Sequence, residues 1–208
     1  MKKLLFSAVL FCSVALSLET KAQAFEEGNV VVSAGYGISL VQSKWLDAAT
    51  TSVSGATIDK YGHSPIYVKF EYGINDDWGI GLSYFNSVYG IKQTYLDNTY
   101  DSFGNIIGTA TYTDDISLVA QAFNFRLNRH IAVSDKFDMY WGFGGGPKFS
   151  KFSYKSNNPN YVSADIKGLP IAFELTYGAR YYITDNIGLY GEIGIARTYL
   201  QVGLCSKF

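Results

Sequence analysis

From residue 30 to the end of the chain, apolar residues alternate with small or polar ones. In segment 30–40 every even-numbered residue is apolar or aromatic, whereas the odd-numbered residues after Val31 are Ser or Gly. A period of two is the spacing of side chains on one face of a β-strand. The pattern therefore predicts strands and no helix after the first 24 residues. Eight strands are predicted, at 30–40, 66–74, 78–84, 116–127, 137–144, 171–181, 187–195 and 200–208.

The fourth of these segments breaks the regular alternation. Ile116 and Leu118 have even numbers, whereas Phe125 and Leu127 have odd ones. A β-bulge adds one residue to a strand and moves the following side chains to the other face. We therefore expect a bulge near residues 120–123.

The connections between the segments alternate between short and long. The short ones contain Asn or Asp, as tight turns require, whereas the long ones are polar, and only the last connection, near 196–198, departs from this order. Within 91–115 the strand pattern continues on both sides of residues 102–105, which predicts a hairpin that projects beyond a membrane. Short turns are expected at 75–77, 128–135 and 184–186, and long connections at 43–64, 91–115 and 151–168.

The first 24 residues have the three parts of a secretory signal peptide. Lys2 and Lys3 precede an apolar stretch at 4–18, and Ala22 and Ala24 are the small residues that a signal peptidase reads. The apolar stretch is shorter than the roughly 20 residues that a membrane helix needs. We predict a signal peptide at 1–24, removal of that peptide after passage through the export translocon, and a single domain at 25–208.

Composition indicates which face of the strands lies outside. Only 17% of the residues are charged, 48% are hydrophobic, and the formal net charge is -1. A near-neutral chain lacks the basic surface of a nucleic-acid binder, and so few charges cannot cover the outside of a soluble barrel, which would show the same alternation with its apolar face inward. Aromatic residues also gather where the strands meet the short turns, as at a membrane interface. We therefore predict an all-β fold, an eight-stranded antiparallel up-and-down transmembrane β-barrel. The aromatic residues at the short turns are Tyr72, Trp78, Phe125, Phe137, Tyr181 and Phe208.

Six charged side chains are expected to point into the barrel, because they alternate along their strands with the apolar residues of the outer face. We call this dependence on odd or even position strand parity. An eight-stranded barrel is only wide enough for side chains to fill it, and an unpaired charge there costs several kcal/mol or more. We expect these residues to form an ion-pair network that closes the lumen. A gate whose ion pairs exchange to pass small ions is the alternative. The six residues are Lys69, Glu71, Asp138, Glu174, Arg180 and Glu192.

Catalytic, metal and cofactor sites are not expected. The only histidines are His63 and His130. His63 is followed by Ser64, but adjacent strand residues point to opposite faces and are poorly placed as a catalytic pair. His130 follows Arg129 in a predicted short turn, where we expect it to be exposed to solvent.

Two long connections carry opposite charge. Lysines dominate 148–168, whereas aspartates dominate 91–115. One hypothesis is that the basic connection, together with Arg197, contacts phosphates of the outer leaflet's lipopolysaccharide through Lys148, Lys151 and Lys155. The alternative is that the two connections attract each other and bind no lipid.

Three short segments carry a resemblance to a known family. Residues 201–208 read QVGLCSKF, residues 133–137 read VSDKF and residues 183–187 read ITDNI. Together with the order of strands and turns, they resemble the small eight-stranded outer-membrane β-barrel family, of the OmpX and OmpA-transmembrane-domain kind, whose members are often labelled as porin family. The resemblance covers 25–208. It implies an integral, multi-pass protein in the outer membrane of a Gram-negative bacterium, exposed at the cell surface.

The resemblance also implies how the barrel is inserted and what it does. In this family the last strand is the signal that the barrel-assembly machinery reads, and Leu200, Val202, Leu204 and Phe208 match it, whereas Ser206 stands where an aromatic residue is usual. We expect a monomer with a structural or surface-interaction role through its extracellular loops and no enzymatic activity. A narrow low-conductance pore and a barrel for uptake of hydrophobic ligands are the alternatives.

Overall fold

The computed structural model describes residues 24–38, 55–195 and 198–208. This part of the chain is all β-structure, and it contains no helix long and apolar enough to cross a membrane. The strands are β1 (Val30–Ile38), β2 (Thr57–Gly73), β3 (Trp78–Tyr100), β4 (Ile106–Val133), β5 (Phe137–Ser156), β6 (Ala164–Lys167), β7 (Ile171–Tyr182), β8 (Ile187–Ile195) and β9 (Leu200–Lys207).

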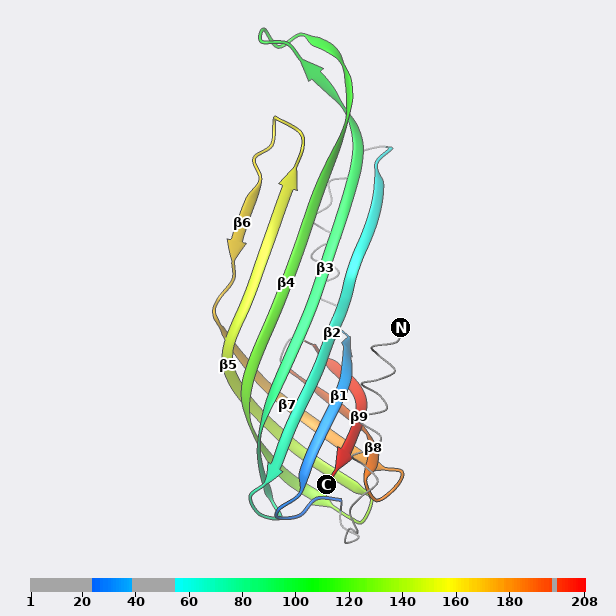
Figure 1. The fold of residues 1–208 in the computed structure, drawn as a ribbon, viewed down its shortest axis with the longest axis vertical. Helices are drawn as coiled ribbons and strands as arrows, with labels where there is room; N and C mark the ends of the chain where they lie inside the picture. Colours follow the sequence, from blue (N-terminus) through cyan, green and yellow to red (C-terminus); the bar gives the residue numbers. More distant parts are fainter. Residues whose placement is uncertain (1–23, 39–54, 196–197) are drawn as a thin grey trace.

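Eight of these strands form a closed antiparallel ring (Figure 1). Neighbours in sequence pair with each other, β9 returns to pair with β1, and β4 pairs with β5, so the ring has no open edge. The short strand β6 pairs only with β5, between β5 and β7 in sequence, and is not part of the ring. The predicted eight-stranded up-and-down barrel is therefore confirmed.

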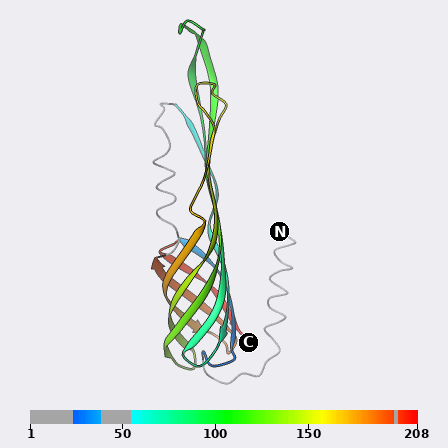
Figure 2. The ribbon, with the colours of Figure 1, turned by 90° about the vertical axis from the view of Figure 1, so that its left-hand side faces the viewer.

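The strands differ greatly in length. β3 has 23 residues and β4 has 28, whereas β1 and β8 have nine each. Because β1 reaches only Ile66 of β2, and β7 reaches only Pro147 of β5, the upper parts of β2–β5 leave the ring. Figure 2 shows them continuing beyond the barrel. The projecting sheet comprises 57–65 of β2, 88–100 of β3, 106–119 of β4, 148–156 of β5, and β6.

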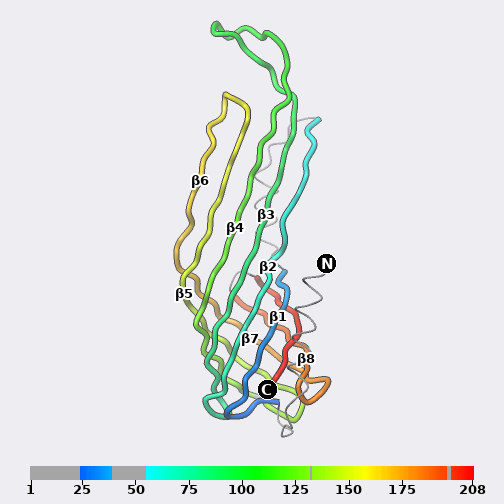
Figure 3. The backbone as a smooth tube through the Cα atoms, viewed as in Figure 1, coloured from blue at the N-terminus to red at the C-terminus, as the bar shows by residue number. Residues whose placement is uncertain are grey.

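The hairpin between β3 and β4 forms the far end of the projecting sheet, as predicted (Figure 3). Its turn passes through Gly104, whose φ of +85° favours glycine. Asp101 fixes the turn by accepting hydrogen bonds from the backbone amides of Phe103 and Asn105, at 2.9 and 2.8 Å.

Apolar side chains cover the outside of the ring, and polar side chains face its interior. On β2, for example, Val68 and Phe70 are exposed, whereas their neighbours Lys69 and Glu71 are buried. Side chains on successive positions of a strand point to opposite faces, so this alternation distinguishes a lipid-facing surface from a lumen. A soluble barrel would have the opposite arrangement.

The predicted bulge in the fourth strand is wrong. The register between β3 and β4 is continuous from Trp78 to Thr99, and β4 keeps one register with β5 on both sides of residues 123 and 124. From Tyr112 to His130 the even-numbered residues of β4 face inward without interruption. The surroundings of the strand change instead. In the projecting sheet Ile116 packs inside with Ile91, whereas in the ring Phe125 faces outward.

Irregular pairing occurs elsewhere. The register shifts between His63 and Ile66 of β2 and between His130 and Ala132 of β4. Two predicted long connections are also shorter than expected, because β2 begins at Thr57, β5 continues to Ser156, and β6 lies within 151–168. Residues 39–54 of the first connection lie outside the described residues.

Candidate functional site

Two clusters of charged side chains fill the ring, and the lower one lies near the short turns. His130 bridges two carboxylates: its Nδ1 lies 2.6 Å from Asp138 Oδ1 and its Nε2 lies 3.0 Å from Glu71 Oε1. Arg180 pairs with the same two residues, through Nη1 to Asp138 Oδ2 at 3.2 Å and through Nη2 to Glu71. The four side chains therefore form a closed cycle of hydrogen bonds.

The geometry assigns a charge to His130. If both carboxylates are ionised, each can only accept hydrogen bonds, so both ring nitrogens of His130 donate and the ring is an imidazolium. With Arg180 it balances the two carboxylates of the lower cluster. The expectation that His130 is exposed is wrong, because β4 continues to Val133 and places this residue in the lumen, only 3% exposed.

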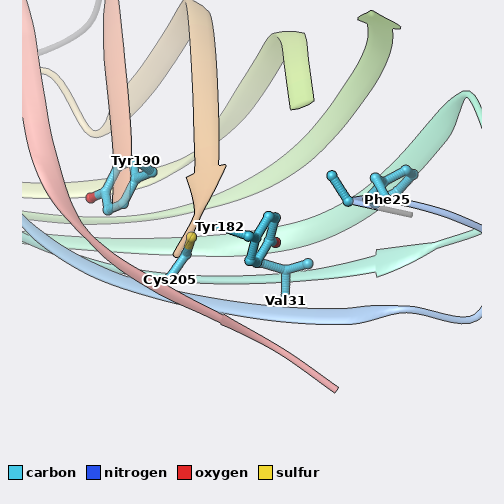
Figure 4. Close-up of a cluster of buried hydrophobic side chains, with 6 residues drawn as sticks. Phe25, Val31, Tyr182, Tyr190 and Cys205 are labelled. Atoms are coloured by element: carbon cyan, nitrogen blue, oxygen red, sulfur yellow. The ribbon is translucent and has the colours of Figure 1, made fainter. Parts of the chain in front are cut away.

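Apolar side chains surround the lower cluster. The ring of Phe25 stacks on the imidazolium, with centroids 3.4 Å apart and planes 12° apart. Figure 4 shows Phe25, Val31, Tyr182 and Cys205, which belong to one buried apolar group. Through Phe25 this apolar group packs directly against the lower cluster.

The upper cluster has two cations and two carboxylates. Glu192 is its centre, with Oε2 2.6 Å from Lys69 Nζ and Oε1 3.1 Å from Arg126 Nη2. Arg126 also reaches Glu174, from Nη1 to Oε1 at 3.3 Å. The Tyr140 hydroxyl donates a hydrogen bond of 2.8 Å to Glu192 Oε1. Like the lower cluster, this group is neutral as a whole.

Glycines leave room for these large side chains. A Cβ on Gly142 would meet Arg126 and Thr176, and one on Gly144 would meet Glu174. The glycine-rich face predicted from the sequence is therefore the counterpart of the charged side chains on neighbouring strands. A Cβ on Gly79 would likewise meet Glu71 of the lower cluster, so side chains pack closely against the strands at both levels.

All six charged residues that strand parity directs into the lumen are buried there, and each belongs to one of the two clusters. Sequence reasoning missed Arg126 and His130. Arg126 had a usable signal, because it lies between Phe125 and Leu127, which both face outward. His130 had none, because the end of the strand was placed too early.

Both histidines are engaged in hydrogen bonds within the described part of the chain. His63 Nδ1 donates to the Ser64 carbonyl at 2.9 Å, so this histidine engages the backbone of its neighbour. In the lumen, Glu71 and Asp138 are engaged by Arg180 and His130. Across the described ranges, no three residues of the types His, Cys, Asp and Glu are grouped to hold a metal ion.

The lysines of the basic connection are not all together. Lys151 pairs with Asp165 at 2.8 Å, and it is also the direct cross-strand partner of Lys167. Lys148 has an even number and shares the inward face of β5, whereas Lys155 lies opposite Asp115, farther along the projecting sheet. Arg197 lies outside the described residues. Hydrogen bonds from Lys151 and Ser153 hold the pKa of Asp165 below its ordinary value.

Backbone hydrogen bonds hold both ends of the described part of the chain in place. The Ala24 amide donates to the Ser134 carbonyl at 2.9 Å, whereas Ala22 lies outside the described residues. At the other end Leu200, Val202 and Leu204 face outward, and Phe208 exchanges backbone hydrogen bonds with Val30. The segment expected to direct assembly is thus the strand that closes the ring.

The side chains on the outer surface of the ring indicate that a membrane surrounds it. Exposed aromatic side chains lie next to the short turns, and exposed aliphatic side chains cover the strands above them. In hydrocarbon only helices and closed barrels satisfy every backbone polar group, and a ring with an apolar outside and a polar inside is a transmembrane barrel. Barrels of this type, with short turns on the periplasmic side, span bacterial outer membranes. The exposed aromatic residues near the turns are Tyr72, Phe137 and Tyr181. Phe125 was also expected there, but β4 continues to Val133, so this residue lies well inside the strand, opposite Leu82 and Gly145.

No family profile and no curated protein matches the sequence. Solved structures with a similar fold include Ail, the attachment invasion locus protein of Yersinia pestis, alone and in complex with sucrose octasulfate. The two Ail structures are 14% and 13% identical to this chain, with TM-scores of 0.44 and 0.45, and the match covers 88% of this chain and 99% of Ail. The N-terminal barrel domain of Pseudomonas aeruginosa OprF is 13% identical, with a TM-score of 0.39, and the match covers 88% of this chain and 98% of that domain.

These likenesses carry no argument about ligands or activity. The architecture rests on the closed strand pairing itself, which is that of the small eight-stranded outer-membrane β-barrels.

Proposed function

We propose that this outer-membrane β-barrel is a closed anchor that holds the projecting sheet at the cell surface, where the sheet takes part in surface interactions. The observation that carries the proposal is the length of β3 and β4, which continue far beyond the ring. Catalysis and transport are not part of this role.

The filled lumen supports the anchor role. Each cluster joins strands from different parts of the ring, so that Lys69 on β2 and Arg126 on β4 both meet Glu192 on β8. Opening a path would separate charges in a region with little water, which is unfavourable because each charge would stay buried without its partner. The clusters therefore favour a stable plug over a channel.

The projecting sheet supports the interaction role. Along one cross-strand row of its outer face, Asp59, Lys92, Asp115 and Lys155 follow one another with alternating charge. Within the described ranges, residues 57–65 pair only with β3, and β6 pairs only with β5. Strand edges with free backbone groups accept added strands from partners. The sheet thus offers both a charged face and edges for recognition.

Truncation of the hairpin tests this role. Residues 95–112 would be replaced by Asn-Gly, which closes a tight two-residue turn. The variant should retain the heat-modifiable gel mobility of a folded barrel, and cells displaying it should lose binding to a panel of immobilised matrix proteins and glycans. A control insertion in the short turn at 184–186 should leave binding unchanged. Equal binding by the wild type and the truncated chain would overturn the proposal.

Uptake of hydrophobic ligands is the second candidate. A groove of about 510 Å³ on the outside of the barrel is lined by Trp141, Leu175, Tyr177 and Ile193, and also reaches Thr176 of the inward face. Native mass spectrometry of the refolded chain with a fatty acid tests this role. Retention of the fatty acid that is lost on Tyr177→Ala supports uptake, and no retention removes it.

Assembly and partners follow from the same proposal. We expect export through the translocon with removal of residues 1–24, insertion by the barrel-assembly machinery through β9, and a monomer in the membrane. Phe208→Ala should then slow insertion in cells more than refolding in detergent.

A further inference from the structure

A pocket of about 520 Å³ lies on the outside of the molecule, where β4 and β5 leave the membrane-facing ring. One wall is the strap that joins β6 to β7. Two backbone hydrogen bonds hold this strap against β5: the Lys148 amide donates to the Pro170 carbonyl at 2.7 Å, and the Gly168 amide donates to the Ser150 carbonyl at 3.0 Å. The wall is therefore part of the fold.

The pocket changes from apolar to basic in the direction away from the membrane. Phe149 faces outward and is 61% exposed, at the level where β7 begins. Two residues farther along β5 lies Lys151, whose cross-strand partners are Val119 on β4 and Lys167 on β6. Directly paired residues of antiparallel strands have their side chains on the same face. An apolar floor and two ammonium groups thus share one surface.

The two lysines carry more charge than their surroundings neutralise. Like charges directly opposite each other destabilise a sheet. Asp165 pairs with Lys151, but one carboxylate for two ammonium groups leaves a net positive charge. The Lys151–Asp165 pair is also about half exposed, so another anion can reach it. An anionic group placed between Lys151 and Lys167 would remove the repulsion.

We propose that this pocket binds the phosphorylated headgroup of an outer-leaflet glycolipid, the lipid A part of lipopolysaccharide. The phosphate lies between Lys151 and Lys167, and an acyl chain runs down over Val119 and Phe149 into the membrane. This inference rests on the orientation of the barrel in the outer membrane and not on the surface role of the projecting sheet. Among the lysines expected from the sequence to contact lipopolysaccharide, Lys148 and Lys151 both line the pocket, and Lys151 is the one on the outer face of β5.

Binding of lipid A to the refolded mature chain tests the site. Native mass spectrometry, or titration of lipid A into phosphatidylcholine nanodiscs that hold the barrel, gives the affinity. The double variant Lys151→Gln, Lys167→Gln should bind at least about tenfold more weakly, as expected for loss of charge-assisted hydrogen bonds. Lys92→Gln is the matched control, because Lys92 lies on the same outer face but opposite Asp115 on the neighbouring strand, away from the pocket. It should bind as the wild type does.

Two further variants test the charge argument, because one should strengthen lipid A binding and the other should not lower the unfolding temperature. Asp165→Asn removes the carboxylate that competes with the phosphate for Lys151 and should strengthen binding about two- to fivefold, the range expected for an exposed ion pair. In nanodiscs without lipid A, Lys167→Gln should keep or raise the unfolding temperature, because it removes a repulsion. A lower unfolding temperature there would contradict the charge argument.

The nature of the ligand is tested separately. Dephosphorylated lipid A should bind weakly, and inorganic phosphate at millimolar concentration should not displace lipid A. Displacement by inorganic phosphate would mean a simple anion site and would overturn the lipid assignment. Equal affinity of the double variant and the wild type, or an equal loss in Lys92→Gln, would overturn the site. Neither result affects the hairpin-truncation experiment, so the two proposals fail independently.

Discussion

Neighbouring residues on one strand of this barrel lie in opposite surroundings. On β8, Glu192 is buried in the upper cluster, whereas Ile193 is 55% exposed on the outside. We predict that Ile193→Arg lowers the free energy of unfolding by about 2–4 kcal/mol, because the arginine would lie near the middle of the bilayer. Urea unfolding of the barrel refolded in lipid vesicles measures this loss.

An outward-facing residue at the edge of the membrane provides the control for Ile193→Arg. Ile183 also faces outward, but it lies beside a short turn at the membrane boundary. Ile183→Arg should cost only about 0–1 kcal/mol. Equal losses at residues 183 and 193 would contradict a membrane-facing surface for this side of β8.

The tip of the projecting hairpin depends on one ionised side chain. Hydrogen bonds from the side chain and backbone of Asn105 lower the pKa of Asp101. Because the folded pKa is below the unfolded one, the stabilisation is complete above the ordinary value of about 3.9 and is lost as the pH falls through the lower folded value. Hydrogen exchange of the Phe103 and Asn105 amides should therefore accelerate, relative to residues of the ring, at low pH only.

A variant checks the assignment to Asp101. Asp101→Asn cannot ionise, so its tip amides should show no acid-dependent change relative to the ring. The same acid response in the variant and the wild type would assign the effect to another group.

The odd or even position of a residue in its strand is enough to predict which charged side chains point into the ring. It is not enough at the end of a strand, where the alternation stops. The lumen positions of Lys69 and Glu174 follow from alternation with lipid-facing neighbours. His130 could not be placed in this way, because alternation does not state where a strand ends. Its burial depends on contacts with Glu71 and Phe25, which are distant in sequence.

At the scale of a strand, β4 shows why an apolar pattern can change face without a bulge. Its upper part lies outside the membrane, where apolar residues such as Ile116 turn inward to escape water, and its lower part lies in the membrane, where Phe125 turns outward to meet lipid. The sequence shows the change of face at the right place. It does not show whether the backbone or the solvent changes, and only the continuous register resolves this.

The actual irregularity of β2 leads to a prediction. Gly62 precedes the register shift and has a φ of +109°, and a Cβ there would meet the Val88 carbonyl. Gly62→Ala should lower the free energy of unfolding by about 1–3 kcal/mol, the usual cost of a strained backbone residue. Gly191→Ala is the control, since a Cβ at that position meets only the Gln201 carbonyl at 3.8 Å. A loss at Gly191 as large as at Gly62 would contradict the conformational argument.

At the scale of the molecule, the ring and the projecting sheet are stabilised separately. The two charge-balanced clusters lie within the ring, and the projecting sheet begins above them, so neither part needs the other to satisfy its polar groups. A ring of this width is filled by side chains. The closed state should therefore be a property of the ring alone.

Conductance of the refolded chain in planar bilayers tests closure. The wild type should show no discrete current steps, because water and ions have no path past Glu192 and its partners. The hairpin-truncated chain should be equally silent, since both clusters lie below the projecting sheet. Heat-modifiable gel mobility of the same samples confirms that the inserted protein is folded. A current that appears only after truncation would assign closure to the projecting sheet.

Variants in the lumen distinguish a plug from a gate. Glu174→Ala and Arg180→Ala each remove one member of a cluster and should lower the free energy of unfolding by about 3–5 kcal/mol, because the remaining partners stay buried with an unbalanced charge. Neither should change a current if the wild type carries none. A wild-type current whose size or ion preference shifts in Glu174→Ala would instead show that the ion pairs exchange, and the anchor role would give way to a narrow pore.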